Sequence, residues 1–274
     1  MKHTSPPPGG RLLLGAVILL FTLPLVWMVS ASVKPAWQLK EDPFSLFPQQ
    51  WCWSNYHQAV TSMPYARYLA NTVCLCCGSV MGTLFSCSLA AYSLARLRWR
   101  GRHFCLGLLI ATMLLPWHVT MIPRFLLLRE LGLYNSLAAL ILPTFLGDAF
   151  FIFLLRQFFL TIPEELSEAA RVDGLSEWGV FWQIVLPLSK PALATVALFQ
   201  FVATWNDFGG PLLYLSDPDK FPLAYGLERF LSSYSDQTHL LMAAATLFTL
   251  PIVVLFVLTQ KTFLQGIRMG GVKG

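Results

Sequence analysis

Charge is scarce in this chain. Of its 274 residues, 12% are Asp, Glu, Lys or Arg, and 55% are hydrophobic. Soluble domains carry about 25% charged residues, so this composition argues against an ordinary soluble domain and indicates a polytopic membrane protein. The net charge of +5 is modest and gathers in short loops. No basic stripe with interleaved aromatic residues is present, so we expect no nucleic-acid partner.

The motifs of several kinds of chemistry are also missing. The chain contains no Gly-x-x-x-x-Gly-Lys-[Ser/Thr] phosphate loop, so it cannot bind ATP in the usual way. No His, Asp or Glu cluster has metal spacing, and no Ser or Cys nucleophile has a convincing partner. We therefore predict no catalytic residue, no metal and no cofactor. Cysteine behaves as a small hydrophobe in apolar helices, so Cys74, Cys76 and Cys77 are interpreted as buried packing residues.

Six apolar runs are long enough to cross a bilayer. A hydrocarbon core of ~30 Å needs about 20 apolar residues in a helix. Each run should be helical, because unpaired backbone groups are costly in lipid. The predicted fold class is therefore all-α, a polytopic membrane protein with six transmembrane helices. The first run is long for a signal peptide, so we favour a retained anchor. The predicted spans are approximately 12–31, 69–95, 104–123, 137–155, 192–215 and 240–260.

The distribution of Lys and Arg orients the chain. With the amino terminus in the cytoplasm, the outer segments hold seven basic residues and the inner ones hold 12. The run Arg96-Leu97-Arg98-Trp99-Arg100-Gly101-Arg102 dominates this bias, as the positive-inside rule expects of a short loop. Both termini and the loop 161–190 are thus predicted to be cytoplasmic. The outer loop 32–68 is rich in Trp and Pro, which fits an interfacial aromatic belt or a docking surface for an external partner.

The loop 161–190 has the pattern of a polar helix, a turn and a second short helix. Pro163 suits the first helical turn, and Glu168 lies in an early turn, where the helix dipole favours negative charge. Gly174 supplies the positive φ that ends the helix. Ser176 can then cap a second short helix.

The spacing of small and acidic residues in this loop favours a docking element. Ala169 and Ala170 leave a small-side-chain face that another protein can approach closely. An ordinary amphipathic surface helix is the simpler interpretation, but it does not account for the whole ordered set. That set comprises Glu168, Ala169, Ala170, Gly174, Ile184, Leu186 and Pro187.

Charged residues within the spans are candidates for a substrate path, because they are expensive in lipid. Asp148 lies in the fourth predicted span and Asp207 in the fifth. Trp205, Asn206 and Asp207 together offer an aromatic face, an amide and a carboxylate, which suits a polyol. The alternative is a polar contact between helices. His118 and Trp117 in the third span are weaker candidates.

Several stretches resemble one family. With the loop spacing, they make the chain similar to permease subunits of binding-protein-dependent ABC importers of the carbohydrate-uptake type, which include the smaller membrane subunit of the maltose transporter. The likeness covers nearly the whole chain and implies one permease domain over 1–274 with a MetI-like architecture. The stretches are Asn55-Tyr56, Asn71-Thr72, Ala90-Ala91-Tyr92-Ser93-Leu94-Ala95-Arg96, Leu155-Arg156-Gln157-Phe158-Phe159 and Trp205-Asn206-Asp207-Phe208.

This resemblance implies a set of partners. The loop would be a coupling helix in a cleft of a cytoplasmic ABC ATPase dimer, with Glu168 facing basic or polar groups. The tail residues Gly271, Val272 and Lys273 would reach into that dimer, although the preceding Gly266-Ile267-Arg268-Met269 departs from the family's small, polar residues. A second, distinct permease subunit, an extracytoplasmic solute-binding protein, membrane lipid and a sugar substrate complete the expectation. The chain would be a multi-pass protein of a bacterial inner membrane and not itself an enzyme.

Three alternatives stay open at this point. An importer for a phosphorylated polyol such as glycerol 3-phosphate would need an added Arg or Lys in the cavity, and none lies deep in a predicted span. An ion-coupled secondary transporter would need inverted repeats and a buried acid; no repeat is found, but Asp148 and Asp207 are acids within spans. A membrane-embedded enzyme would need the catalytic clusters that the sequence lacks.

Overall fold

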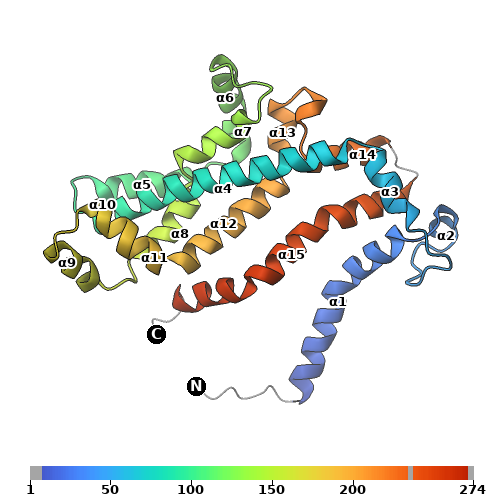
Figure 1. The fold of residues 1–274 in the computed structure, drawn as a ribbon, viewed down its shortest axis with the longest axis horizontal. Helices are drawn as coiled ribbons and strands as arrows, with labels where there is room; N and C mark the ends of the chain where they lie inside the picture. The colour runs from blue at the N-terminus through green and yellow to red at the C-terminus, as the bar shows by residue number, and fades with distance from the viewer. Residues whose placement is uncertain (1–7, 234–236, 271–274) are drawn as a thin grey trace. The chain divides into compact units, whose positions relative to one another are not determined.

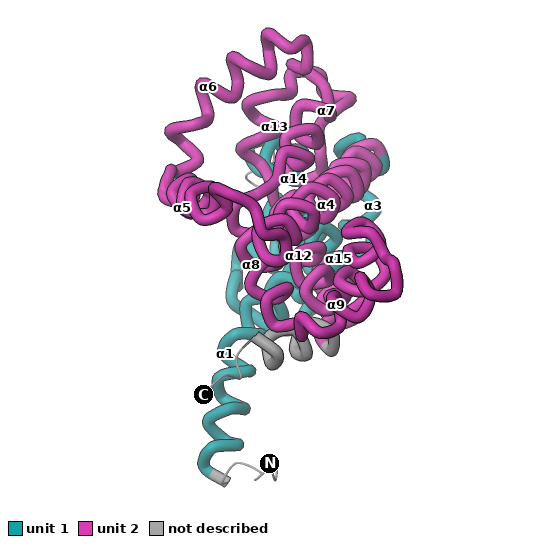
Figure 2. The backbone as a smooth tube through the Cα atoms, turned by 90° about the vertical axis from the view of Figure 1, so that its left-hand side faces the viewer, with its two compact units in different colours: residues 1–66, 226–251 teal, residues 67–225, 252–274 magenta. Residues whose placement is uncertain are grey.

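The computed structural model describes residues 8–233 and 237–270, and every regular element in those ranges is a helix (Figure 1). Contacts divide the chain into two compact units, residues 1–66 with 226–251 and residues 67–225 with 252–274 (Figure 2). Within the described residues, four helices are individually long and apolar enough to cross a membrane. The number rises to six if each of two bent helix pairs counts as one span.

The first unit contains α1 (Pro8–Ser32), α2 (Ala36–Glu41), α3 (Ser54–Thr61) and the first part of α15 (Thr238–Gly270). Asn55 fixes the loop after α1, because its amide donates to the carbonyls of Ser32 and Lys34 at 2.9 and 2.8 Å. Small side chains let α3 and α15 pack closely, with Ala59 and Ala243 fully buried. The apolar residues of α1 are largely exposed, as expected of a lipid-facing helix.

Helix α4 (Tyr65–Arg96) runs through the second unit (Figure 1). Near its start, Thr72 Oγ1 accepts a hydrogen bond from Leu223 N at 2.8 Å, where α14 (Leu223–Ser233) begins. Its last residue, Arg96, lies about 36 Å further along the helix axis at 1.5 Å per residue. This one rigid element therefore connects opposite ends of the unit.

A glycine lets another segment approach α4 closely. A Cβ added at Gly82 would lie 2.4 Å from Thr144 Oγ1, so no side chain fits there. Gly78 lies one turn earlier, and together they form a G-x-x-x-G pattern of the kind that brings membrane helices together. The segment that they face consists of α7 (Ala138–Ile141) and the 3₁₀ helix η1 (Leu142–Leu146).

Three predicted spans, the third, fourth and fifth, are interrupted in the structure. The third, expected as one helix over 104–123, consists of α5 (Arg102–Thr112) and α6 (Trp117–Glu130), which meet at 101°. Pro116 explains the break, because it has no N–H to continue the ladder and restricts the residue before it. The fifth span comprises α12 (Lys190–Trp205) and the short α13 (Gly209–Tyr214).

The fourth apolar run continues from η1 into α8 (Ala149–Phe159) across a break at Gly147. The loop 161–190 then forms α9 (Glu164–Val172), α10 (Glu177–Val180), the π-helical turn η2 (Phe181–Val185) and α11 (Leu186–Leu188). A continuous hydrophobic core joins this loop to the spans. Its fully buried side chains include Leu155, Phe159, Val180, Val185 and Val196.

Only one residue of the cysteine cluster is buried as predicted. Cys76 is buried on α4, whereas Cys74 and Cys77 are exposed on it. Helix geometry explains the difference, because adjacent residues point to different sides. Among the described residues, no group of three or more His, Cys, Asp or Glu side chains is placed to hold a metal.

Candidate functional site: the 161–190 loop and the span cavity

Helix α9 ends in the hydrogen-bond pattern of a Schellman motif. Gly174 N donates to Arg171 O and Leu175 N donates to Ala170 O, both at 3.0 Å. Gly174 has φ +88°, a conformation that glycine adopts without a Cβ penalty. The predicted glycine stop is thus present in the structure, and it sets the direction in which the chain leaves α9.

The second short helix begins where the sequence predicts. Ser176 Oγ accepts a hydrogen bond from Gly179 N at 3.3 Å and caps α10. Glu177, the first residue of α10, accepts a bond from Arg171 Nε at 2.8 Å. This hydrogen bond raises the pKa of Arg171, so the guanidinium stays charged. The pair closes the turn between the two helices.

Two residues of α4 fix this loop to the spans. The Tyr92 hydroxyl lies 2.7 Å from the Glu177 carboxylate, which already holds Arg171. Four residues later, Arg96 Nη2 donates to Phe159 O at 2.6 Å and also to Ile162 O. Its other amino group lies 3.6 Å from Glu164 at the start of α9.

Burial makes the Arg96 contacts strong. Its side chain is only 3% exposed, and charge-assisted hydrogen bonds in a low-dielectric setting are stronger than neutral ones in water. Arg96 therefore fixes the entry to the loop, and Tyr92 fixes the turn between α9 and α10. Because the two residues are separated by four positions, they share one face of α4.

The outward face of the loop mixes acid and apolar side chains. Glu165 and Glu168 are exposed on α9. Beside them, Leu166 is half-exposed and Val172 is 87% exposed, and Trp178 of α10 is 62% exposed. Exposed apolar side chains within a polar loop mark a surface suited to another protein.

The structure corrects one predicted residue of this surface. Ala170 is 7% exposed and belongs to the chain's own hydrophobic core, so it does not form an outward face with the exposed Ala169. Ile184 and Leu186 pack against the same core, whereas Pro187 is exposed. The tail residues Gly271, Val272 and Lys273 lie outside the described residues.

Both candidate acids of the spans line one cavity of about 240 Å³. Asp148 caps α8, since its carboxylate accepts hydrogen bonds from Phe150 N at 2.9 Å and Phe151 N at 3.2 Å. Asp207 lies between α12 and α13 and accepts a bond from Gly210 N at 3.0 Å. Each acid therefore has a local backbone role and also faces the cavity.

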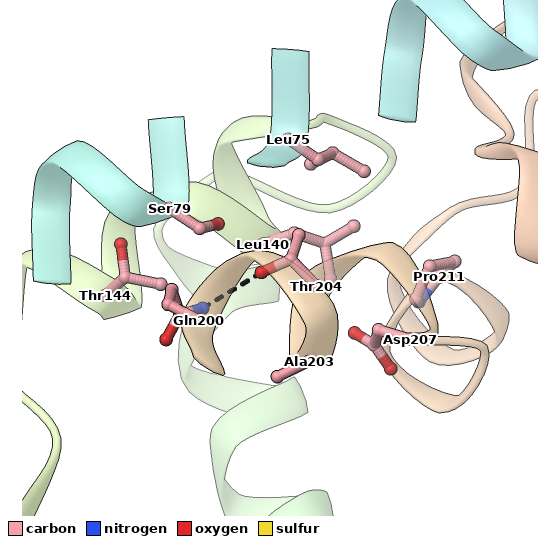
Figure 3. A pocket seen from close by; sticks show the side chains of 9 residues that line it. All are labelled: Leu75, Ser79, Leu140, Thr144, Gln200, Ala203, Thr204, Asp207 and Pro211. Carbon is pink, nitrogen blue, oxygen red and sulfur yellow. Dashed lines mark hydrogen bonds between the residues drawn. The ribbon is translucent and has the colours of Figure 1, made fainter. Parts of the chain in front are cut away.

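A neighbouring cavity of about 260 Å³ shares Asp207 and has mixed polar and apolar walls (Figure 3). In it, Gln200 Nε2 donates to Thr204 Oγ1 at 2.9 Å, one turn along α12. Ser79 contributes from α4 and Thr144 from η1. Hydroxyl, amide and carboxylate groups thus line this cavity together with Leu75 and Leu140.

The other residues of the Trp205-Asn206-Asp207 set are placed differently. Trp205 is 2% exposed and stacks on Phe201, with ring centroids 5.4 Å apart. The Asn206 amide donates back to Val202 O at 2.8 Å. Neither residue lines the two cavities described above, whereas Trp117 of the third span lines the first. Their roles toward a substrate stay predictions.

Sequence reasoning missed a cation in the cavity. Arg124 of α6 lines it together with Asp148 and Asp207, although no basic residue was expected there. It follows the predicted end of the third span by one position, and the sequence does not predict that the span turns by 101° before it. Gln200 was also missed, although a lone amide in an apolar helix is a signal of the same kind as Asp207.

Comparison with known proteins gives consistent matches. Residues 82–269 match the model of a family described as "Binding-protein-dependent transport system inner membrane component". The chain is 34% identical to the arabinooligosaccharides transport system permease protein AraQ of Halalkalibacterium halodurans, over 100% of this chain and 99% of that protein. It is 31% identical to the diacetylchitobiose uptake system permease protein NgcG of Streptomyces coelicolor, over 94% of this chain and 86% of that protein.

One solved structure matches with a TM-score of 0.83 at 28% identity, covering 93% of this chain and 95% of the other. It is the crystal structure of a bacterial ABC transporter involved in the import of the acidic polysaccharide alginate. The alginate transporter in complex with an alginate pentasaccharide-bound periplasmic protein matches at 15% identity with a TM-score of 0.67, over 97% and 95% of the two chains. That second likeness concerns the fold alone.

Proposed function

Because the chain belongs to the family of binding-protein-dependent transport system inner membrane components, we propose that it is a permease subunit of an ATP-driven oligosaccharide importer. The family and the all-α fold predicted from the sequence are confirmed. Relatives that cover most of the chain are named for arabinooligosaccharides and diacetylchitobiose. As a translocation subunit in the membrane, the chain is not itself an enzyme.

The outward face of α9 is the observation that carries the coupling proposal. Glu168 is exposed there with apolar neighbours, on a helix that Arg96 fixes to the spans. In our proposal this face docks in a cleft of a cytoplasmic ABC ATPase dimer. The chain lacks a phosphate loop of its own, so a separate subunit has to bind and hydrolyse ATP.

The proposed cycle is alternating access. ATP binding draws the two ATPase subunits together, α9 moves with one of them, and α4 transmits the movement through Arg96 and Tyr92. The cavity then opens outward to receive sugar from a solute-binding protein, and it opens inward after hydrolysis. ATP can shift this equilibrium only because the ATPase binds the two conformations with different affinity. A second permease subunit completes the pore, and both termini lie in the cytoplasm.

The cavity chemistry fits an oligosaccharide better than a phosphorylated polyol. Asp148, Asp207 and Gln200 can accept hydrogen bonds from hydroxyl groups, and Trp117 offers a ring face. Arg124 supplies a positive charge, but two carboxylates line the same cavity. A phosphate dianion would meet a net negative lining in this subunit, which opposes its entry.

Charge reversal at Glu168 tests the coupling. The chain is co-expressed with its ATPase, second permease and binding protein, and ATPase co-purification and sugar uptake into vesicles are measured. We expect Glu168→Lys to reduce both by at least about tenfold, as loss of ~1.4 kcal/mol or more at the interface would. Glu130→Lys, which changes an exposed acid at the end of α6, serves as the control. Normal uptake by Glu168→Lys would refute the proposed docking.

The substrate class is tested separately with the wild-type assembly. Labelled arabino-, chito- and uronate oligosaccharides are offered with the binding protein, and glycerol 3-phosphate is offered as a competitor. Uptake of an oligosaccharide that glycerol 3-phosphate does not inhibit is the expected result. ATP-dependent uptake of glycerol 3-phosphate alone would reject the sugar assignment and leave the coupling result standing.

A further inference from the structure

An apolar cavity lies between the last turns of α4 and helix α10. Its volume is about 300 Å³, and its walls include Leu89, Leu97, Trp178 and Phe181. The polar groups at one wall are already paired, since the Tyr92 hydroxyl lies 2.7 Å from the Glu177 carboxylate. A polar ligand would lose hydrogen bonds with water on entering this cavity, whereas a hydrocarbon chain would not.

Three arginines, at positions 98, 100 and 102, directly follow Leu97 of the cavity wall. Trp99 Nε1 donates to the carbonyl of Ser93 at 3.2 Å, and Arg102 Nη1 donates to that of Leu97 at 3.4 Å. Ser93 and Leu97 both line the cavity, so the 98–102 segment is held against it. Within the described parts of the chain, no carboxylate forms an ion pair with the rim arginines, which are Arg98, Arg100 and Arg102.

A hydrophobic slot beside arginines that form no ion pair with a carboxylate within the described residues matches the two ends of an anionic lipid. We propose that a phospholipid of the inner leaflet binds here, with an acyl chain between Leu89 and Trp178 and its phosphate on the rim arginines. Basic clusters beside a membrane span attract anionic headgroups, and Trp99 is a residue type that favours the interface. The site rests on the orientation given under the proposed function, but lipid binding needs neither sugar nor ATP.

Lipid retention tests the headgroup contact. The assembled transporter is purified, titrated with an equimolar mixture of phosphatidylglycerol and phosphatidylcholine, and its bound lipid is identified by native mass spectrometry. We expect preference for phosphatidylglycerol to fall about fivefold for each rim arginine removed, as in Arg98→Gln and Arg100→Gln. Arg129→Gln removes an exposed arginine from α6, away from the cavity, and should change nothing. The proposed site would be overturned if the wild-type assembly retained both lipids equally. It would also be overturned if Arg129→Gln lost as much preference for phosphatidylglycerol as the rim variants.

Quenching tests the acyl-chain contact. Phosphatidylglycerol brominated on its acyl chain should quench the fluorescence of the wild-type assembly more than that of Trp178→Phe. Filling the cavity with Ser93→Phe should abolish this difference. If Trp178 is not quenched although the arginine variants lose lipid, the chain does not enter the cavity and the proposal fails. If the brominated lipid quenches Trp178 only after the ATPase is removed, a protein partner occupies the cavity and the proposal likewise fails.

Failure of the lipid site can be told apart from failure of the proposed function. Lipid preference is measured without nucleotide or solute, whereas the Glu168→Lys experiment measures ATPase docking and uptake. Loss of lipid preference with normal uptake would remove only the lipid site. Normal uptake by Glu168→Lys with intact lipid preference would remove only the coupling assignment.

Discussion

Replacing Gly174 perturbs the proposed coupling loop, residues 161–190, by an amount that the structure allows us to work out. Its φ of +88° costs an L-residue about 1–2 kcal/mol. No atom lies within 4 Å of an added Cβ, so there is no steric clash. Alanine also reduces the entropy of the unfolded chain, which offsets about 0.4–1 kcal/mol. Gly174→Ala therefore lowers the free energy of unfolding of the loop by about 1 kcal/mol. This corresponds to roughly a fivefold shift from the native loop conformation toward the unfolded one.

Other substitutions at this position should rank by how well they adopt positive φ. Asparagine tolerates this region better than alanine, and Asn135 adopts it in this chain with φ 58°. Proline fixes φ near −65° and removes the N–H that donates to Arg171 O at 3.0 Å. We expect sugar uptake to fall in the order Gly, Asn, Ala and Pro, with Gly174→Pro inactive but still inserted in the membrane.

Gly132 provides a matched control for this series. It follows α6 with φ +70°, donates to Arg129 O at 3.0 Å and has open space around its Cα. Leu133 N donates to Leu128 O at 2.9 Å, so the motif is the same as at Gly174. Gly132→Ala should cost the same locally and leave ATP-driven uptake near wild type. Equal loss of uptake in the two alanine variants, at equal protein levels, would refute a special role for Gly174.

Further predictions concern α4 and the cavity. Tyr92→Phe removes only the hydroxyl that holds Glu177. Losing a hydrogen bond to a charged group costs about 1.5–3 kcal/mol at most, so sugar uptake should fall several-fold at constant expression. Arg96→Met leaves the two carbonyls it holds without their donor, so the folded fraction recovered by size-exclusion chromatography should fall sharply, with partial recovery in Arg96→Lys. Asp148→Asn keeps an N-cap residue, so it should alter uptake but not thermal unfolding, whereas Asp148→Ala should alter both. Asp207→Asn should likewise change uptake at unchanged assembly, and an effect on expression alone would contradict its place in the path.

Features that depend on local chemistry could be predicted from the sequence. The stop at Gly174 and the cap at Ser176 are set by short-range backbone requirements, and both are present as expected. The apolar runs that form α1 and α4 are helices close to their predicted bounds, whereas α15 begins close to the predicted start at 240 but continues past the predicted end at 260 to Gly270. The break at Pro116 was missed because proline is common in membrane helices and only tertiary packing decides whether a helix bends or ends there.

Features that depend on contacts between distant segments could not be predicted. In the sequence, Arg96 is a topology signal and the end of a stretch that resembles the family, and neither use predicts that its side chain is buried against carbonyls more than 60 positions away. The sequence predicts an outward face for Ala170, but the structure buries this residue in the hydrophobic core. The prediction fails because residue spacing alone does not show which side of α9 the core covers. Arg124 entered the cavity lining only through the bend between α5 and α6.

If the 161–190 loop docks on an ATPase as we propose, the placement of α4 gives a route by which a subunit without ATP chemistry would respond to ATP. Thr83 of α4 lines the cavity that holds both acids, and Arg96 of the same helix fixes the entry to the coupling loop. The two residues lie about 20 Å apart along the axis at 1.5 Å per residue. A helix is stiff over this distance, and Gly82 holds it tightly against the segment that leads to Asp148. Movement of α9 would therefore reach the cavity through a single rigid element. Flexible joints between α9 and the cavity would instead dissipate that movement.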